Sequence, residues 1–313
     1  MIKTITLLVL PFFTTPSLCM NNDTLSILDN TVPESNKDLF GERKSIFSTK
    51  YEIALKVNGT LFESVFDNKG HIRYFSIIHG DINHMENNAN NLQDLESLTL
   101  INNRGYVEIT ENSFKELIKL RELIIHLNHG VTLKENCLKS LVNLEVLSVD
   151  NQTYNEISNA TIGNCRKLKY LSWSNGFLGQ INPNTFQNLK NLVSITFKNV
   201  HLRTIAPKTF SDLPRLSILD LSDNKISKLL GHEFKLPSLE VLNLDRNLLI
   251  SIDVEKIFEN APLLKILEVF HNKLSCKMKV KVYDFMAAKN ITSVERTEVE
   301  RCMYVDKIQI FSS

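Results

Sequence analysis

The side chains of this sequence best suited to metal binding or nucleophilic chemistry are its histidines and cysteines. His126 and His129 lie three residues apart, and His79 and His84 flank another turn. Such pairs can ligate zinc, but surface histidines at loop edges are the better interpretation. No HExxH, GxSxG, phosphate-loop or dinucleotide-binding motif occurs in the sequence. We therefore expect no catalytic residue, no metal site and no cofactor.

The elements that carry these residues follow one repeated apolar pattern. It is clearest in residues 216–249, where L-x-x-L-x-L-x-x-N-x-L occurs twice: Leu216, Leu219, Leu221, Asn224 and Ile226, then Leu239, Leu242, Leu244, Asn247 and Leu249. This pattern is typical of the leucine-rich repeat. Its x-L-x-L part alternates as a short strand does, so its leucines point into a shared core. The Asn amide can bond backbone groups of neighbouring turns.

The first leucine position recurs along most of the chain at intervals of 23 to 25 residues. Its members are Ile72, Leu95, Leu120, Leu144, Leu168, Leu192, Leu216, Leu239 and Leu264. A repeat this short holds one strand and a short return, and no copy can bury its leucines alone. We predict an α/β solenoid, a leucine-rich-repeat horseshoe of about nine repeats. Its parallel sheet lines the concave face and its convex side is short, 3₁₀ or irregular.

Composition and periodicity divide the chain into five segments. Residues 1–19 hold one charged residue, Lys3, and a short apolar run, as in a secretory signal peptide. Residues 20–50 form a polar leader, and residues 51–71 are predicted to be an N-terminal cap hairpin around Asn58-Gly59. The repeats occupy residues 72–274 and a C-terminal cap residues 275–313. No apolar run after the signal is long enough to span a membrane.

The cysteines after the signal form two candidate pairs. Cys276 and Cys302 bracket the C-terminal cap, and we predict a disulfide between them. Cys137 and Cys165 fall on the predicted convex side of consecutive repeats. Cys165 fills a core position that is normally Leu, so a buried thiol and a second disulfide both remain open for this pair.

The middle repeats depart from the asparagine pattern. Gln152, Gly176 and Val200 occupy the ladder position, and an asparagine stands one position earlier at residues 151, 175 and 199. Drifted repeats that have repacked are one interpretation, and a rim altered for a ligand is the other. Asn151 also begins a glycosylation sequon, as do Asn22, Asn58, Asn159 and Asn290. A secretory signal followed by several sequons favours an extracellular glycoprotein.

The surface predicted to bind is the concave sheet, where alternate strand residues face solvent. The candidate contacts are Tyr74, Ile78, Ile101, Glu122, His126, Asp150, Tyr170, Lys198, Asp220, Asp245, Glu268 and Phe270. The first strands present more apolar groups and the last strands gather carboxylates. This distribution predicts a partner with apolar contacts at one end and basic contacts at the other.

The chain resembles the secreted, typical-type leucine-rich-repeat proteins over about residues 72–302. The phrases LPRLSILDLSDNKISKL and LPSLEVLNLDRNLL, with INPNTF and IAPKTF, are similar to repeats of Toll-like receptor ectodomains and insect immune leucine-rich-repeat proteins. C-terminal caps of that family usually carry Cys-x-Cys followed by two further cysteines. This chain has Cys276 and Cys302 alone there, and so departs in detail.

These observations favour a secreted, non-enzymatic recognition protein that binds a protein or microbial-surface ligand in innate immunity. The formal net charge is +1, and it falls to zero once Lys3 is removed with the signal, which argues against nucleic acid as a partner. A second leucine-rich-repeat protein, in a homo- or hetero-oligomer, is a further candidate partner. The alternatives are an adhesion or developmental ligand, and an inhibitor of a protease or phospholipase.

Overall fold

The computed structural model describes residues 6–9, 53–56, 58–61, 73–78, 81–85, 92–101, 106–127, 130–151, 157–178, 181–211, 213–229, 234–293 and 302. Ile72, His79, His129, Asn22 and the polar leader therefore lie outside the described residues. So does the side chain of Asn58.

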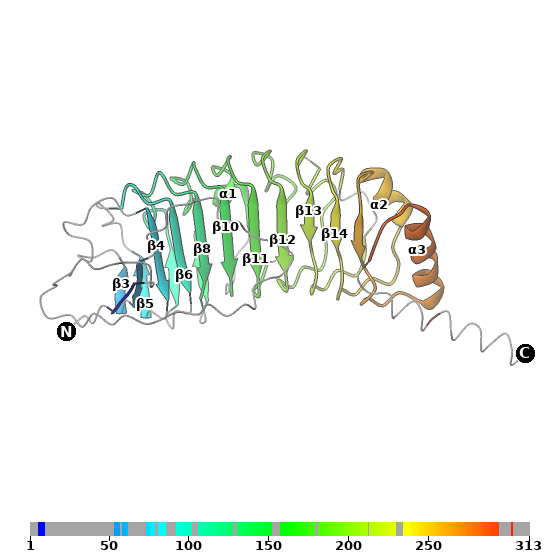
Figure 1. Cartoon of the computed structure of the whole chain (residues 1–313), viewed down its shortest axis with the longest axis horizontal. Coiled ribbons are helices and arrows are strands. Elements are labelled where there is room, and N and C mark those ends of the chain that lie inside the picture. Colours follow the sequence, from blue (N-terminus) through cyan, green and yellow to red (C-terminus); the bar gives the residue numbers. More distant parts are fainter. Residues whose placement is uncertain are drawn as a thin grey trace, which may run out of the picture.

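One sheet of eleven strands runs through the molecule, and its strands follow one another in a single row (Figure 1). Ten of them are β2 (Ile53–Lys56), β4 (Tyr74–Ile78), β6 (Ser97–Ile101), β8 (Glu122–His126), β10 (Val146–Asp150), β11 (Tyr170–Ser174), β12 (Ser194–Lys198), β13 (Ile218–Asp220), β14 (Val241–Asn243) and β15 (Ile266–Glu268). These pair in parallel. The eleventh, β1 (Thr6–Val9), is antiparallel to β2 and lies within the predicted signal peptide.

The strands pair in register, so equivalent leucines of successive repeats lie side by side. Leu123 is opposite Leu98 on one side and Leu147 on the other, and all three are fully buried. Each fully buried leucine contributes roughly 1.5–3 kcal/mol of hydrophobic free energy. The predicted parallel solenoid is confirmed, and the core is one continuous interior along its length.

A second sheet of four strands accompanies the N-terminal turns, where the sequence predicted irregular returns. It consists of β3 (Asn58–Leu61), β5 (Asp81–Met85), β7 (Val107–Ile109) and β9 (Val131–Leu133). Val107 and Ile109 are buried and the residue between them is exposed, and β9 shows a similar alternation. Two apolar residues in alternation favour a strand. Most later repeats place one apolar residue there, and in the last one Ile250 is exposed. These repeats form no second sheet among the described residues.

The predicted N-terminal hairpin is wrong. β2 pairs with β4 in the large sheet, and β3 pairs with β5 in the small one. Asn58 and Gly59 lie in β3 and not in a turn between two paired strands. The offsets from Ile53 to Phe75 and from Asn58 to Asp81 are 22 and 23 residues, close to the repeat period. This segment is therefore a further turn of the solenoid.

The interior on the side opposite the large sheet contains a column of stacked phenylalanines. The ring centroids of Phe186 and Phe210 are 5.6 Å apart, and those of Phe210 and Phe234 are 6.5 Å apart. Such offset pairs stabilise beyond their buried area. In the C-terminal part, the rings of Phe258 and Phe285 pack edge to face with their centroids 6.0 Å apart.

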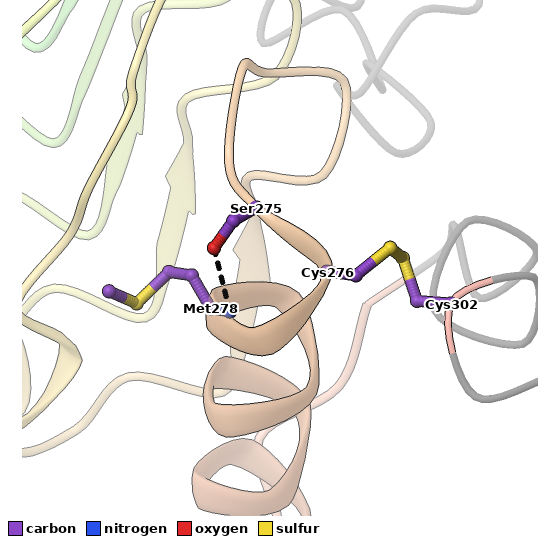
Figure 2. Close-up of a disulfide and its surroundings, with 4 residues drawn as sticks. All are labelled: Ser275, Cys276, Met278 and Cys302. Atoms are coloured by element: carbon purple, nitrogen blue, oxygen red, sulfur yellow. Dashed lines mark hydrogen bonds between the residues drawn. A yellow bond between two sulfur atoms is a disulfide. The ribbon is translucent and has the colours of Figure 1, made fainter. Parts of the chain in front are cut away.

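The described residues include the helices α1 (Asn159–Ile162), α2 (Val254–Asn260) and α3 (Cys276–Ala288). Ser275 is the N-cap of α3, and its hydroxyl accepts a hydrogen bond from the Met278 N–H group at 3.3 Å (Figure 2). Val282 is buried from the same helix. Cys276, at the start of α3, forms a disulfide with Cys302, with the Cα atoms 5.2 Å apart. This bond joins the helix to the end of the chain.

An asparagine closes the turn after each of the last three strands. Asn224 Oδ1 accepts hydrogen bonds from the backbone N–H groups of Val200 and Leu202, both at 3.1 Å. Asn247 and Asn272 each accept one such bond from the preceding turn at 3.0 Å, and donate to backbone carbonyl oxygens. Asn224 and Asn247 are buried, so these side chains satisfy backbone groups that water cannot reach.

The middle repeats keep the same turn with the asparagine in a different place. Asn151, Asn175 and Asn199 have φ values of 57°, 49° and 53°, and the equivalent Asp223 and Arg246 have 57° and 50°. The residue before the ladder position is therefore left-handed in all five turns. Asparagine tolerates this conformation better than most residues. The asparagine therefore changes its position in the sequence while the backbone geometry of the turn stays the same.

We expect Asn224→Ala to lower the free energy of unfolding by at least about 2 kcal/mol, because two buried N–H groups would lose their acceptor. Urea denaturation measures the change. Asn164→Ala is the matched control in an exposed turn and should change stability by less than about 0.5 kcal/mol. Equal stability of the two variants would contradict the role of the asparagine ladder.

We expect Cys302→Ser to lower the stability of the C-terminal cap by roughly 3–4 kcal/mol, from the chain entropy of the loop that closes over a separation of 26 residues. Differential scanning calorimetry measures this as a lower melting temperature. A reducing agent should lower the melting temperature of the wild type to that of the variant and leave the melting temperature of the variant unchanged. A reductant effect of equal size on both proteins would contradict this assignment.

Candidate functional site

The side of the large sheet that points away from the core, called the sheet face below, is where the sequence placed the ligand contacts. β8 shows its construction, because Glu122, Ile124 and His126 are half-buried while Leu123 and Ile125 are fully buried. Most of the predicted contacts share this half-buried state on the sheet face or its edge: Ile101, Glu122, His126, Asp150, Tyr170, Lys198, Asp245 and Glu268.

Three predicted contacts are wrong because their side chains are buried. The exposed fractions of Tyr74, Asp220 and Phe270 are 7%, 4% and 0%. Phe270 belongs to the hydrophobic core. Asp220 Oδ1 accepts a hydrogen bond from the Ser222 N–H group at 2.9 Å, and burial raises the pKa of its carboxyl group. A ligand on the sheet face would not reach these groups. The side chain of Ile78 lies outside the described residues.

The carboxylates at the C-terminal end of the sheet already have partners within the chain. Asp245 accepts a hydrogen bond from the His271 backbone N–H group at 2.8 Å, and its other oxygen lies 2.7 Å from His271 Nδ1. Glu268 accepts one from the Ser293 hydroxyl at 2.6 Å. A basic partner would compete with these bonds. The expected acidic patch for a basic ligand is therefore weaker than the sequence predicted.

The central strands present a mixed polar surface. His126 Nε2 lies 2.8 Å from the Ser148 hydroxyl oxygen. Asp150 Oδ1 accepts hydrogen bonds from the Asn151 N–H group and from Asn175 Nδ2, both at 2.9 Å. Lys198 is the last residue of β12. This combination of donors, acceptors and charges of both signs suits binding by surface complementarity.

A row of alternating charges at the start of the strands was missed in the sequence. Glu145 Oε1 accepts from Arg121 Nη2 at 2.6 Å, and its Oε2 accepts from Lys169 Nζ at 2.7 Å. Burial alone would raise the pKa of Glu145, but the bonds from Lys169 and Arg121 lower it below its ordinary value. Arg73 pairs with Glu96 in the same way. Opposite charges one repeat apart are the signal that identifies this row.

Cys137 and Cys165 are free thiols, so the alternative of a second disulfide is not adopted. Both are buried. Burial raises the pKa of each thiol to about 12, so neither ionises near neutral pH. Cys165 Sγ also lies 3.8 Å from the carbonyl oxygen of Leu138. The pair behaves as part of the apolar core.

The described part of the chain holds no group of three or more His, Cys, Asp or Glu side chains arranged to bind a metal ion. Among the same residues, no helix combines the length and apolar character needed to cross a bilayer.

We expect Asp220→Asn to stabilise the protein at neutral pH relative to the wild type. A buried carboxyl group with a raised pKa favours the folded state when protonated, so the wild type loses stability as the pH rises from 3.8, the ordinary value, through the raised folded value. Asn keeps an acceptor for the Ser222 N–H group and has no charge to bury. Thermal unfolding across this pH range should show the difference growing with pH. A difference independent of pH would contradict it.

Two family models match the chain. One, described as leucine-rich repeat, matches residues 166–226 and 214–274, and the other, described as a BspA-type leucine-rich repeat region, matches residues 60–177. The second range includes three of the four strands of the small sheet, β5, β7 and β9. No curated protein sequence matches the chain.

Two solved structures illustrate the fold. The crystal structure of a TLR13–ssRNA13 complex superposes with a TM-score of 0.59 at 24% identity, covering 64% of this chain and 29% of that one. The structure of an LRR protein of Leptospira interrogans gives 0.59 at 20% identity, covering 71% of this chain and 54% of that one. The chain thus spans less than two thirds of either. At these identities the likeness concerns the fold.

The two family models together extend from residue 60 to residue 274. Over this range the structure shows successive parallel strands with leucines in register and a shared core. This chain belongs to the leucine-rich-repeat proteins.

Proposed function

We propose that this chain is a secreted recognition protein that binds a protein or microbial-surface ligand on its sheet face, without catalysing a reaction. The observation that supports this is that every strand of the sheet from β6 to β15 carries half-buried side chains on this face. Solenoid sheets of this kind offer an extended surface and no enclosed pocket. A large ligand can contact many repeats at once.

A column of apolar side chains on the last strands is the part of this surface best suited to an energetic contact. Ile218, Val241 and Ile266 lie side by side in β13, β14 and β15, and all are half-buried. Burial of these partly exposed apolar groups in a complex would contribute favourable hydrophobic free energy, so we place the centre of the interface there.

Nucleic acid is a poor candidate for this ligand. The chain without its signal is neutral, and several of its cationic side chains are paired with carboxylates, as in the row that includes Arg121 and Lys169. Binding to RNA or DNA depends on cations that neutralise phosphates.

An immune role is the proposal that the resemblance of the repeat phrases suggests.

We expect Val241→Glu to lower the affinity for the natural ligand at least about tenfold, because a carboxylate would be buried in an apolar contact. Capture from extracellular fluid by the immobilised chain, followed by cross-linking mass spectrometry, identifies the ligand and its contacts. Ile250→Glu is the matched control, since Ile250 is 68% exposed and lies outside the strands. Equal loss in both variants, or cross-links away from the sheet, would contradict the proposal.

We also propose that the chain is secreted after cleavage behind Cys19 and carries N-glycans. Asn290 is exposed, whereas Asn151 Nδ2 donates a hydrogen bond to the Leu127 carbonyl oxygen at 2.8 Å. Expression in a eukaryotic secretory host and peptide mapping should find a mature chain that begins at Met20, with a glycan on Asn290 and none on Asn151. Retention of Met1 in the secreted chain would contradict the cleavage, and a glycan on Asn151 would contradict the predicted site choice.

A further inference from the structure

Polar side chains at the ends of β10, β11 and β12 form a chain of hydrogen bonds. Asn199 Nδ2 donates to Asn175 Oδ1 at 3.0 Å, and Asn175 Nδ2 donates to Asp150 Oδ1 at 2.9 Å. Both asparagines are exposed and Asp150 is half-buried. The three groups come from successive repeats, so their spacing follows that of the strands, about 4.8 Å.

This chain of bonds leaves polar capacity that faces solvent. Within the described part of the structure, Asp150 Oδ2 and Asn199 Oδ1 accept no hydrogen bond, and each amide retains a second N–H. Because the bonds all run in one direction, each polarises the next. The result is a fixed row of donors and acceptors that ends in a carboxylate.

An aromatic pair comes from the same two turns as Asn175 and Asn199. The rings of Phe177 and His201 have centroids 5.9 Å apart and are inclined at 31°. The two residues follow Asn175 and Asn199 by two positions each. His201 Nδ1 donates to the Gly176 carbonyl oxygen at 3.1 Å, which leaves Nε2 of the neutral ring available as an acceptor.

The backbone at His201 is held in an uncommon conformation. Its φ is 61°, and Asn199, two residues earlier, is also left-handed. A left-handed non-glycine residue costs free energy, and such residues persist where their placement serves a site. Here the conformation brings the imidazole beside Phe177. We call Asp150, Asn175, Phe177, Asn199 and His201 the amide–aromatic patch.

We propose that the amide–aromatic patch binds an oligosaccharide. Planar amide and carboxylate groups bond pairs of neighbouring sugar hydroxyls, and an aromatic face packs against the C–H groups of a sugar ring. A spacing of one strand is close to the length of one sugar unit in a linear chain. A peptide ligand would need pockets for side-chain anchors, whereas the patch offers shallow polar groups. The inference rests on the proposed recognition function and deepens it by naming the ligand class.

The test uses the full secreted chain on immobilised chito-, laminari- and manno-oligosaccharides and peptidoglycan fragments. We expect binding to at least one of these, and at least a tenfold loss of affinity in the double variant Asn175→Gly, Asn199→Gly. Glycine adopts positive φ without strain, so the turns remain while the amides are removed. His201→Ala should lower the affinity as well.

Arg246→Gly is the control, because it also introduces glycine at an equivalent left-handed position and leaves the patch intact. It should bind as the wild type does. Binding to none of the oligosaccharides, or equal binding by the double variant, overturns the proposal. If no oligosaccharide binds, but a protein ligand binds and Val241→Glu abolishes that binding, the recognition function stands and the sugar assignment fails. If the wild type binds neither an oligosaccharide nor a protein ligand, both the sugar assignment and the recognition function are wrong.

Discussion

Hydrogen bonding between neighbouring turns is the constraint on which this molecule depends. The backbone groups of each short strand are satisfied by the strands before and after it, so no repeat is stable alone. Register follows from this. A shift of one residue would move the leucines of a strand such as β8 from the core to the solvent side. The buried row from Leu98 through Leu123 to Leu147 and the backbone ladder therefore fix each other.

The turns after the strands meet this constraint in two ways. In the last repeats a buried asparagine, as at Asn224, bonds backbone groups of two turns. In the middle repeats the asparagine occupies the left-handed position, and at Asn175 its amide donates to an acidic side chain of the preceding repeat, Asp150. The second arrangement exchanges a buried polar anchor for an exposed polar row. That exchange is what makes the middle of the solenoid a candidate for ligand binding.

Pairing between repeats also shapes the electrostatics of the surface. Charges that the sequence alone would count as available, such as Glu145 and Asp245, are engaged by groups one repeat away. Screened surface pairs contribute little to stability individually. Their effect here is to leave small polar groups and apolar side chains, such as Ile218 and Val241, as the surface that a partner meets.

The sequence by itself determined the strands, because the leucine period and the alternation within each repeat leave one way to bury a continuous core. It also indicated most of the strand residues that alternate away from the interior. It could not show the second sheet, the placement of residues 53–61 as another turn, or the burial of Asp220 and Phe270. These depend on contacts between turns, which have no local signature. The meeting of Asp150, Asn175 and Asn199 is likewise decided by the tertiary structure, since residues 24 or 25 positions apart become neighbours when the coil closes.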